Sequence, residues 1–240
     1  MIFYRIYQVL IMIPVLLVAT ILTATTTIIG SLLGMGRWFG YYPPRLWSKL
    51  FCIMTGVKVT VKGRENINRE TSYVFVANHQ GAYDIFAIYG YLNHNFRWMM
   101  KKALRKIPFV GYSCQVSGQI YVDNSSPGAV TKTMETAKRQ LSNGMSLVVF
   151  PEGARTPDGK LHDFKRGAFR LAMEFNLPVV PVTIDGSYSV MTRRSKLPRP
   201  GHIILTIHRP IVAGPEGHDQ KQLMEQSRAA IASALPRGGE

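Results

Sequence analysis

The stretch YVFVANHQGAYD, which begins at Tyr73, is an apolar run that stops at Asn78 and His79 and is followed by one acid, Asp84. In a continuous helix, residues five apart point about 140° away from each other, so His79 and Asp84 can meet only if the backbone turns between them. Gly81 permits such a turn, and a helix can begin just after it. An imidazole held by a carboxylate suits a general base that removes a proton from a hydroxyl group. We therefore predict that His79 and Asp84 form a catalytic pair; the alternative is that Asn78 and His79 only cap the turn.

A second apolar run, SLVVF, ends in the polar segment PEGAR, which contains Glu152, Gly153 and Arg155. Ligands of open α/β sheets bind beyond the carboxyl ends of the strands. Arg155 can donate two parallel hydrogen bonds to a phosphate, and Glu152 can accept one from a substrate hydroxyl or hold the arginine in place. The alternative is an ordinary turn with a surface ion pair. Pro181 lies in a third apolar run, and because a proline in a strand belongs at an edge or a bulge, we expect it to border the site.

The elements that must position these side chains follow a regular pattern after residue 57. We predict strands at residues 59–61, 73–77, 120–122, 147–150, 179–184 and 203–207, and helices at residues 126–144, 167–175 and 220–235. Several of the strands are apolar on consecutive residues, as strands covered on both faces are. The alternation predicts an α/β fold with a mixed, largely parallel sheet flanked by helices.

The N-terminal segment has a different composition, because no charged residue lies between Arg5 and Arg37. The run is longer than the roughly 18 uncharged residues that indicate a membrane helix, and it is too long for the apolar part of a signal peptide. Either one tilted membrane-spanning helix or a shallow two-helix hairpin fits it. Basic residues gather after the run, which places the rest of the chain in the cytoplasm. We therefore predict a membrane-anchoring segment at residues 1–56 and an α/β domain that faces the cytoplasm at residues 57–240.

The chain carries 29 Lys and Arg residues against 14 Asp and Glu residues, a formal net charge of +15, which favours anionic partners. We find no zinc spacing, helix-turn-helix pattern or RNA-binding motif, so we expect neither a metal ion nor a nucleic-acid partner. Cys114 is the rival nucleophile. It has no histidine close in sequence, and we predict that it is a buried structural thiol.

Four segments in this order, NHQGAYD, GQIYVD, FPEGAR and VPVTI, resemble the sequence blocks of the glycerolipid acyltransferases, and more narrowly those of the bacterial 1-acyl-sn-glycerol-3-phosphate acyltransferases. The resemblance extends from the apolar N-terminus to at least Ile207. It implies transfer of a fatty acyl group from acyl-CoA or acyl carrier protein to the sn-2 hydroxyl of lysophosphatidic acid, giving phosphatidic acid in phospholipid biosynthesis. It implies no metal and no tightly bound cofactor. Membrane phospholipids are the further expected partners, with the active site on the cytoplasmic face of the inner membrane.

The resemblance also implies roles for individual residues. His79 takes the proton from the acceptor hydroxyl and Asp84 orients its ring, without an acyl-enzyme stage. Asn78 either positions the turn or polarises the developing oxyanion, and Pro181 belongs to the last block. The residues implied to bind the glycerol-phosphate acceptor are Glu152, Gly153, Arg155 and the lysine pair Lys101 and Lys102.

Three positions depart from the family pattern. Ala154 stands where the family usually has threonine, Asn124 where it has arginine, and Ala103 where it has glutamate. These departures leave the catalytic pair intact and leave a different lysolipid acceptor open. A noncatalytic, lipid-binding membrane scaffold of the same fold is the alternative from another class, and a hydrolase that uses His79 to activate water is a further one.

Overall fold

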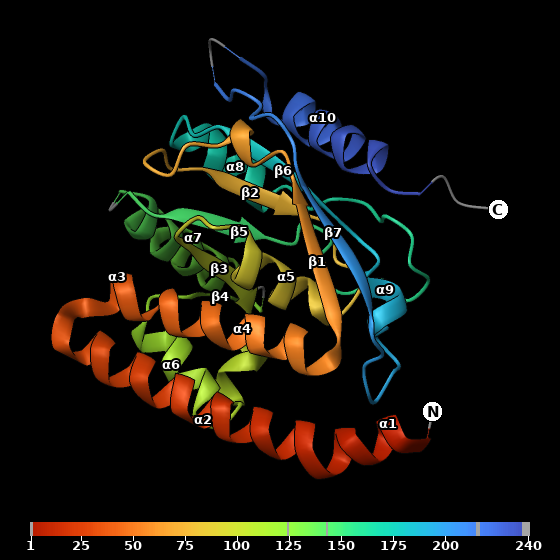
Figure 1. The fold of residues 1–240 in the computed structure, drawn as a ribbon. Coiled ribbons are helices and arrows are strands. Elements are labelled where there is room, and N and C mark those ends of the chain that lie inside the picture. Colours follow the sequence, from red (N-terminus) through yellow and green to blue (C-terminus); the bar gives the residue numbers. More distant parts are fainter. Residues whose placement is uncertain (1, 124, 143, 215–216, 237–240) are drawn as a thin grey trace.

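The structure is a computed structural model that describes residues 2–123, 125–142, 144–214 and 217–236. Within these residues, one sheet contains strands in the order β1-β7-β6-β2-β5-β3-β4 (Figure 1). The strands are β1 (Val57–Lys62), β2 (Val74–Ala77), β3 (Phe96–Lys101), β4 (Ile120–Val122), β5 (Ser146–Val149), β6 (Val179–Asp185) and β7 (Gly201–Ile207). From β6 to β4 every neighbouring pair is parallel, whereas β6 and β7 are antiparallel. The prediction of a mixed, largely parallel sheet is confirmed.

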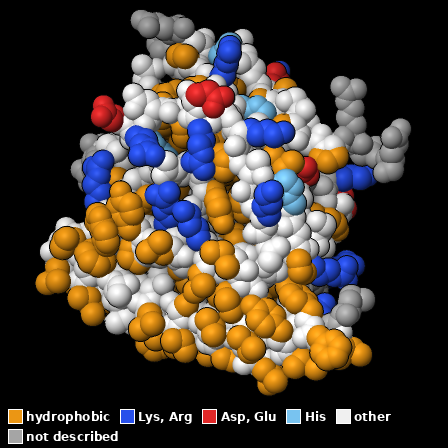
Figure 2. Space-filling model, viewed as in Figure 1, with side chains coloured by type: hydrophobic (Ala, Val, Ile, Leu, Met, Phe, Trp, Pro, Cys, Tyr) orange, Lys and Arg blue, Asp and Glu red, His pale blue; other side chains and the backbone are white. Residues whose placement is uncertain are grey.

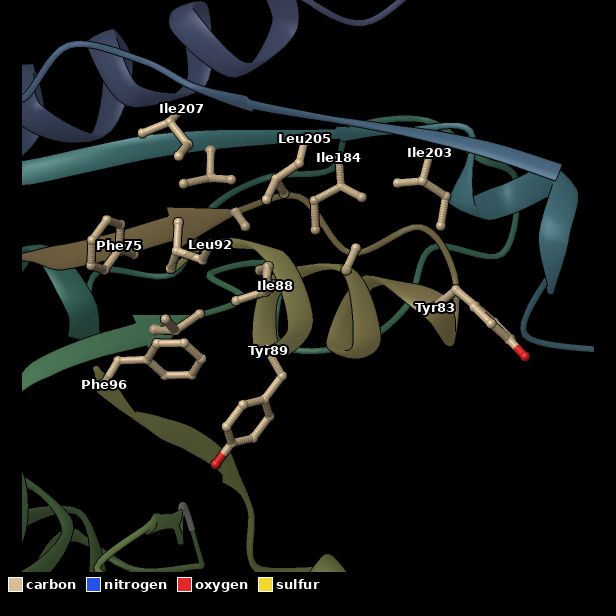
Figure 3. Packing of buried hydrophobic residues seen from close by; sticks show 14 of the residues in the cluster. Phe75, Tyr83, Ile88, Tyr89, Leu92, Phe96, Ile184, Ile203, Leu205 and Ile207 are labelled. Carbon is tan, nitrogen blue, oxygen red and sulfur yellow. The ribbon is translucent and has the colours of Figure 1, made fainter. Parts of the chain in front are cut away.

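Helices cover both faces of this sheet (Figure 1). On one face α4 (Tyr42–Thr55) and α5 (Tyr83–Tyr91) enclose the largest apolar core, where Ile88 and Leu92 lie against strand residues such as Phe75 (Figure 3). On the other face, α8 (Gly167–Glu174) and α10 (Gln220–Ser233) pack on β2 and β6. Helix α7 (Pro127–Ser142) covers β4 and β5. The remaining helices of this domain are α6 (Val110–Val116) and α9 (Ser187–Val190).

The structure adds elements that we did not predict. Strand β3 escaped notice because its second residue, Arg97, interrupts the apolar pattern although its side chain is buried. Helix α6 was also missed, and α4 was included only as part of the N-terminal segment. The predicted helices at residues 126–144, 167–175 and 220–235 are confirmed within two residues at each end.

The N-terminal residues form a hairpin with α4. Helices α1 (Ile2–Tyr7), α2 (Ile13–Gly30) and α3 (Gly36–Phe39) are joined by wider helical turns, and Gly34, with φ 82°, interrupts the last of these turns. Helix α4 then runs back beside α2 (Figure 1). The stretch Ile2–Phe39 is long and apolar enough to cross a membrane, judged by length and composition. Helix α4 ends just before residue 57, and whether residues 1–56 and 57–240 are separate units stays a prediction.

Helix α2 turns one face to the protein and the other outward. Its buried residues lie three or eight positions apart on one side and are Leu16, Ala24, Thr27 and Gly30. Large apolar side chains on the outer side are exposed, and with those of α1 they cover the lower face of the molecule in Figure 2. A band of lysine and arginine side chains lies above this apolar face in the same view. The layout is an exposed apolar surface with positive charge at its border.

Pro181 does not lie at a sheet edge, as we had predicted, but in the central strand β6, where it pairs with Val76 of β2. The proline is tolerated because its nitrogen faces the β7 side at the point where the β6–β7 ladder ends. The ladder runs as far as Val182 and Ile207, and the next contact is a single bond from the His208 amide to the Pro181 carbonyl, 3.0 Å long. Only the one bond that an N–H at residue 181 would have returned to residue 208 is missing, and it falls at the end of the ladder.

Candidate active site

The parallel strands bring the polar segments together at one edge of the sheet. Asn78 and His79 follow β2, the segment that begins with Phe150 follows β5, and Lys102 follows β3. Because β2, β5 and β3 are neighbours and parallel, their carboxyl ends lie side by side. The predicted site residues from distant parts of the sequence therefore share one edge, where ligands of such sheets bind.

His79 and Asp84 meet as predicted. The ring nitrogen Nδ1 of His79 lies 2.8 Å from Oδ2 of Asp84, which is completely buried in the first turn of α5. The same oxygen accepts a bond of 2.9 Å from the amide of Gly81. A side chain at Gly81 would approach the carbonyl oxygen of Ser187 to 2.4 Å, so the turn between base and acid needs a glycine. The bond at Nδ1 fixes the ring orientation and leaves Nε2 as the nitrogen that can accept a proton.

The His79 ring is only 13% exposed and lies flat on a neighbouring aromatic ring. The centroids of His79 and Phe150 are 3.9 Å apart and their planes differ by 7°. Trp98 of β3 stacks in turn on Phe150, at 5.3 Å. None of the described residues bonds Nε2. Our sequence analysis missed both aromatic residues; the only signal was that Phe150 immediately precedes the Glu152 segment.

The backbone of His79 is also held on both sides by the loop after β5. Its amide donates to Oε1 of Glu152 at 2.7 Å, and its carbonyl accepts from the amide of Thr156 at 2.9 Å. The second oxygen of Glu152 accepts from the amide of His162 at 3.0 Å. Burial raises the pKa of Glu152, and these amide bonds partly oppose that shift. Glu152 thus braces the turn that carries the base, where we had predicted a contact with substrate.

We expect Glu152→Gln to lower kcat by about tenfold while the KM for the acceptor stays near its wild-type value. Glutamine offers one oxygen where two amides need an acceptor, and a buried donor without a partner costs about 1–3 kcal/mol. Steady-state kinetics and thermal denaturation in detergent measure the two effects. A large rise in KM with unchanged stability would instead assign Glu152 to substrate binding.

Asn78 has a different position from the predicted one. Its side chain is completely buried, and it donates to the carbonyl and accepts from the amide of Ile184, both at 2.8 Å. These bonds tie the end of β2 to β6 and direct the amide group away from the His79 ring. Asn78 therefore positions the turn, the first of the two predicted roles, and substrate binding by its side chain is not supported. Pro181 lies inside the sheet and not in the cluster around His79.

Cationic side chains lie along the same edge. Arg155 is half-buried in the loop after β5, and no described residue bonds its guanidinium. Lys165 lies against Gly153, because a Cβ on that glycine, whose φ is 78°, would come within 2.7 Å of Nζ. Lys102 pairs with Asp123 at 2.6 Å and, with Ser125, lowers the pKa of Asp123 to about 2.

The remaining predicted positions are placed as follows. Lys101 and Ala103 are exposed beside Lys102, and Ala154 is half-buried between Gly153 and Arg155. Asn124 lies outside the described residues. Lys165 was missing from the predicted site, although the basic pair before α8 was a visible signal.

Cys114 does not compete as a nucleophile. It lies in α6, partly exposed rather than fully buried, and burial raises the pKa of its thiol to about 11, so the reactive thiolate is scarce at neutral pH. Among the described residues, no group of three or more His, Cys, Asp or Glu side chains could hold a metal ion. The absence of a metal or cofactor from the reaction stays a prediction.

The site combines a histidine, oriented by a buried carboxylate, with lysine and arginine side chains at the carboxyl edge of an α/β sheet. Such a combination suits an enzyme that activates a hydroxyl group for attack on an acyl group. The chain belongs to the Acyltransferase family, whose model matches residues 58–185.

Comparison with individual proteins is more specific than the match to the family model. The chain is 32% identical to a 1-acyl-sn-glycerol-3-phosphate acyltransferase of Chlamydomonas reinhardtii over 82% of this chain and 58% of that protein. It is 30% identical to the enzyme of the same name from Saccharomyces cerevisiae over 77% of this chain and 62% of that protein. The chain thus spans about three fifths of the length of these relatives. The crystal structure of the 1-acyl-sn-glycerophosphate (LPA) acyltransferase from Thermotoga maritima superposes with a TM-score of 0.74 at 27% identity, over 96% of this chain and 97% of that one.

Proposed function

We propose that the protein transfers a fatty acyl group from a thioester donor to the sn-2 hydroxyl of 1-acyl-sn-glycerol-3-phosphate and so forms phosphatidic acid. The observation that carries the proposal is the 2.8 Å bond between His79 and buried Asp84, which leaves Nε2 as the nitrogen that can accept a proton at the edge of the sheet that also carries Arg155. A base and a cation that no described residue bonds, on one edge of the sheet, suit an acceptor that has both a hydroxyl and a phosphate. The named relatives support the same substrate.

The reaction needs one proton relay and no covalent enzyme intermediate. Nε2 of His79 takes the proton of the acceptor hydroxyl while the hydroxyl oxygen attacks the thioester carbonyl. Asp84 stabilises the imidazolium that forms. The carbon–oxygen ester bond forms, the carbon–sulfur bond breaks, and the departing thiolate takes the proton back from His79. The stacked ring of Phe150 covers one side of the imidazole and keeps it in the plane that this relay needs.

The acceptor phosphate is bound by cations beyond the strand ends. Arg155 and Lys165 lie on the loop that also braces His79, so binding of the phosphate there places the rest of the acceptor close to the base. Lys101 and Lys102 lie on the neighbouring strand end, but Lys102 already pairs with Asp123. We therefore assign the main phosphate contact to Arg155. The donor is acyl-CoA or acyl carrier protein, and no metal ion takes part.

The apolar N-terminal helix supports a site that works at a membrane. Helix α2 packs along α4 and α6, and Gln8, just before it, donates to the Pro198 carbonyl at 2.8 Å. A helix fastened lengthwise to the domain cannot cross a bilayer without drawing that domain into the hydrocarbon. Its exposed apolar side therefore lies in one leaflet with the helix axis along the surface, which is the hairpin alternative of our sequence analysis. The membrane is the inner membrane, with the active site on its cytoplasmic face.

The substrate assignment is tested by offering purified protein in detergent or liposomes a long-chain acyl-CoA or acyl carrier protein, with a panel of lysolipid acceptors. We expect conversion of lysophosphatidic acid to phosphatidic acid. Acylation of another lysolipid, and not of lysophosphatidic acid, would agree with His79 as the base and refute lysophosphatidic acid as the acceptor. Thioester loss without any acceptor would identify a hydrolase, and the absence of both reactions would favour the lipid-binding scaffold.

Arg155→Gln is expected to raise the KM for lysophosphatidic acid by about tenfold, the effect of losing one charge-assisted contact worth about 1.5–3 kcal/mol. The kcat at saturating acceptor stays within a fewfold of wild type, because the variant leaves the His79–Asp84 bond in place. Arg170→Gln removes the same charge from the exposed side of α8 and serves as the matched control. An unchanged KM in Arg155→Gln would show that another cation makes the main contact with the acceptor phosphate.

A further inference from the structure

A second polar cleft lies at the amino edge of the sheet, opposite the edge that carries His79. It has a volume of about 310 Å³ and opens between the turn from α2 to α3, the start of β3 and the segment between α6 and β4. Its lining includes Arg37, Arg97, Gly118 and Gln140. Arg97 is in register with Val74 of β2 through Leu147 of β5, and β2 extends three residues further to its carboxyl end. About 10 Å of sheet therefore separates this cleft from the active site.

Arg97 is buried without a matching negative charge. Its side chain is 3% exposed. Nη1 donates to the Phe96 carbonyl and to the Asn95 side chain, and Nη2 donates to the Gly36 carbonyl at 2.9 Å. No carboxylate among the described residues forms an ion pair with it, and its buried Nε has no hydrogen-bond partner there. A buried charge is costly unless it is paired, so this guanidinium lacks an anion.

The unpartnered Nε lies just behind two residues that line the cleft. A Cβ placed on Gly118 would lie 3.5 Å from that nitrogen and 3.0 Å from Nε2 of Gln140. Both residues line the cleft, so the guanidinium of Arg97 lies directly behind its wall. An anion in the cleft would offset a buried positive charge that no described carboxylate pairs with.

Arg37 adds a second positive charge to the same cleft. Burial lowers the pKa of Arg97, Tyr89 offsets part of that shift, and the like charge of Arg37 lowers the pKa further. Two guanidinium groups that repel each other across one cleft gain most from an anion with several oxygens, and arginine matches the geometry of phosphate.

We propose that this cleft binds the phosphate group of an anionic phospholipid at the membrane surface. The lipid assignment rests on the rim, because the turn that borders the cleft exposes Leu32, Leu33 and Met35 by 64%, 73% and 52%. These side chains continue the apolar face of α2, so acyl chains beside the phosphate would lie against them. A free phosphate ion has no apolar part that could contact these side chains.

The second site goes beyond the proposed reaction, because its occupant is not consumed. Helix α2 provides affinity for any lipid surface, and the apolar face alone leaves the molecule free to tilt about the helix axis. A phosphate held at the α2–α3 turn fixes that end of the helix at headgroup depth and favours membranes rich in anionic lipid.

The test measures binding of the full chain to phosphatidylcholine vesicles with and without phosphatidic acid, in the absence of any acyl donor. Arg37→Gln removes one cation, and Gln140→Glu puts a carboxylate next to Arg97 in place of the lipid phosphate. Each variant is expected to lower affinity for the anionic vesicles by about fivefold or more, the effect of losing one basic contact at an anionic surface. Arg170→Gln and Gln226→Glu make the same charge changes on exposed parts of α8 and α10 and are expected to bind nearly as wild type does.

Thermal denaturation with inorganic phosphate separates the two sources of a phosphate group. The proposal is supported if the wild type and both controls bind anionic vesicles preferentially and both cleft variants lose this preference. Cleft variants that bind these vesicles as their controls do would overturn it. A second result would also refute the lipid assignment. In it, inorganic phosphate raises the melting temperature of the wild type but not of the cleft variants, while the cleft variants bind vesicles as the wild type does. Because no acyl transfer is measured, a wrong substrate assignment leaves this result unaffected.

Discussion

Replacement of His79 by alanine is expected to lower acyl transfer by about a hundredfold to ten-thousandfold, the contribution of a well-placed general base. Under the proposed mechanism the variant loses the base, Nε2, that takes the proton of the acceptor hydroxyl, because Nδ1 is already bonded to Asp84. The change is expected in kcat rather than in acceptor affinity. Initial rates of phosphatidic acid formation, with lysophosphatidic acid varied at saturating donor, measure it.

His202→Ala is the matched control, because this histidine is exposed on β7 and bonds the Thr60 hydroxyl far along the sheet. Vesicle binding and thermal stability are measured for both variants, so that loss of the base is separated from loss of the fold. His79→Ala with near wild-type turnover would exclude histidine base catalysis. Acyl transfer would then depend on a group other than His79.

Asp84→Asn is expected to lower kcat by about a thousandfold or more, although the side chain keeps its size. The new amide would present N–H groups to Nδ1 of His79, which favours the tautomer with the proton on Nε2, and that nitrogen could then no longer act as a base. An equivalent change in a Ser-His-Asp triad, whose carboxylate also holds Nδ1, costs about 10⁴ in kcat. Steady-state kinetics give the loss, and the ¹⁵N chemical shifts of the His79 ring report the tautomer directly.

A role for Asp84 in folding alone predicts a different pattern. Its Oδ2 also accepts from the Gly81 amide, and an amide nitrogen turned to His79 at that place gives up this bond, so a modest fall in melting temperature is expected. Asp163→Asn, at an exposed loop position, controls for the lost charge. A variant with a much lower melting temperature and an unchanged ring tautomer would show that Asp84 only supports the turn.

Most of the sheet could be predicted because its strands are short apolar runs bounded by turns. Strand β3 could not be, since the buried guanidinium of Arg97 makes Phe96–Lys101 read as a polar segment. The position of Pro181 was wrong for a related reason. Whether a strand is central depends on which strands lie beside it, and a local pattern cannot show where the β6–β7 ladder ends.

The candidate site was predicted where its contacts are local and missed where they are long-range. His79 and Asp84 are close in sequence, and the glycine between them signals the turn. Glu152 was expected to bind the acceptor or to hold Arg155, and Asn78 either to position the turn or to polarise the oxyanion. Their partners are backbone groups of Ile184, His79 and His162, and no side-chain pattern marks a backbone amide as the partner of a distant residue.

The outward apolar face of α2 has a kinetic consequence. A protein held by this face in one leaflet meets an insoluble acceptor by diffusion in two dimensions, so the concentration that governs its rate is the mole fraction of acceptor in the lipid. Adding inert phospholipid at a fixed total amount of acceptor would then slow the enzyme by dilution at the surface, whereas adding buffer would not. For a water-soluble donor, the concentration in the bulk solution would govern the rate instead. The same active site would then depend on the surface concentration of the acceptor and on the volume concentration of the donor.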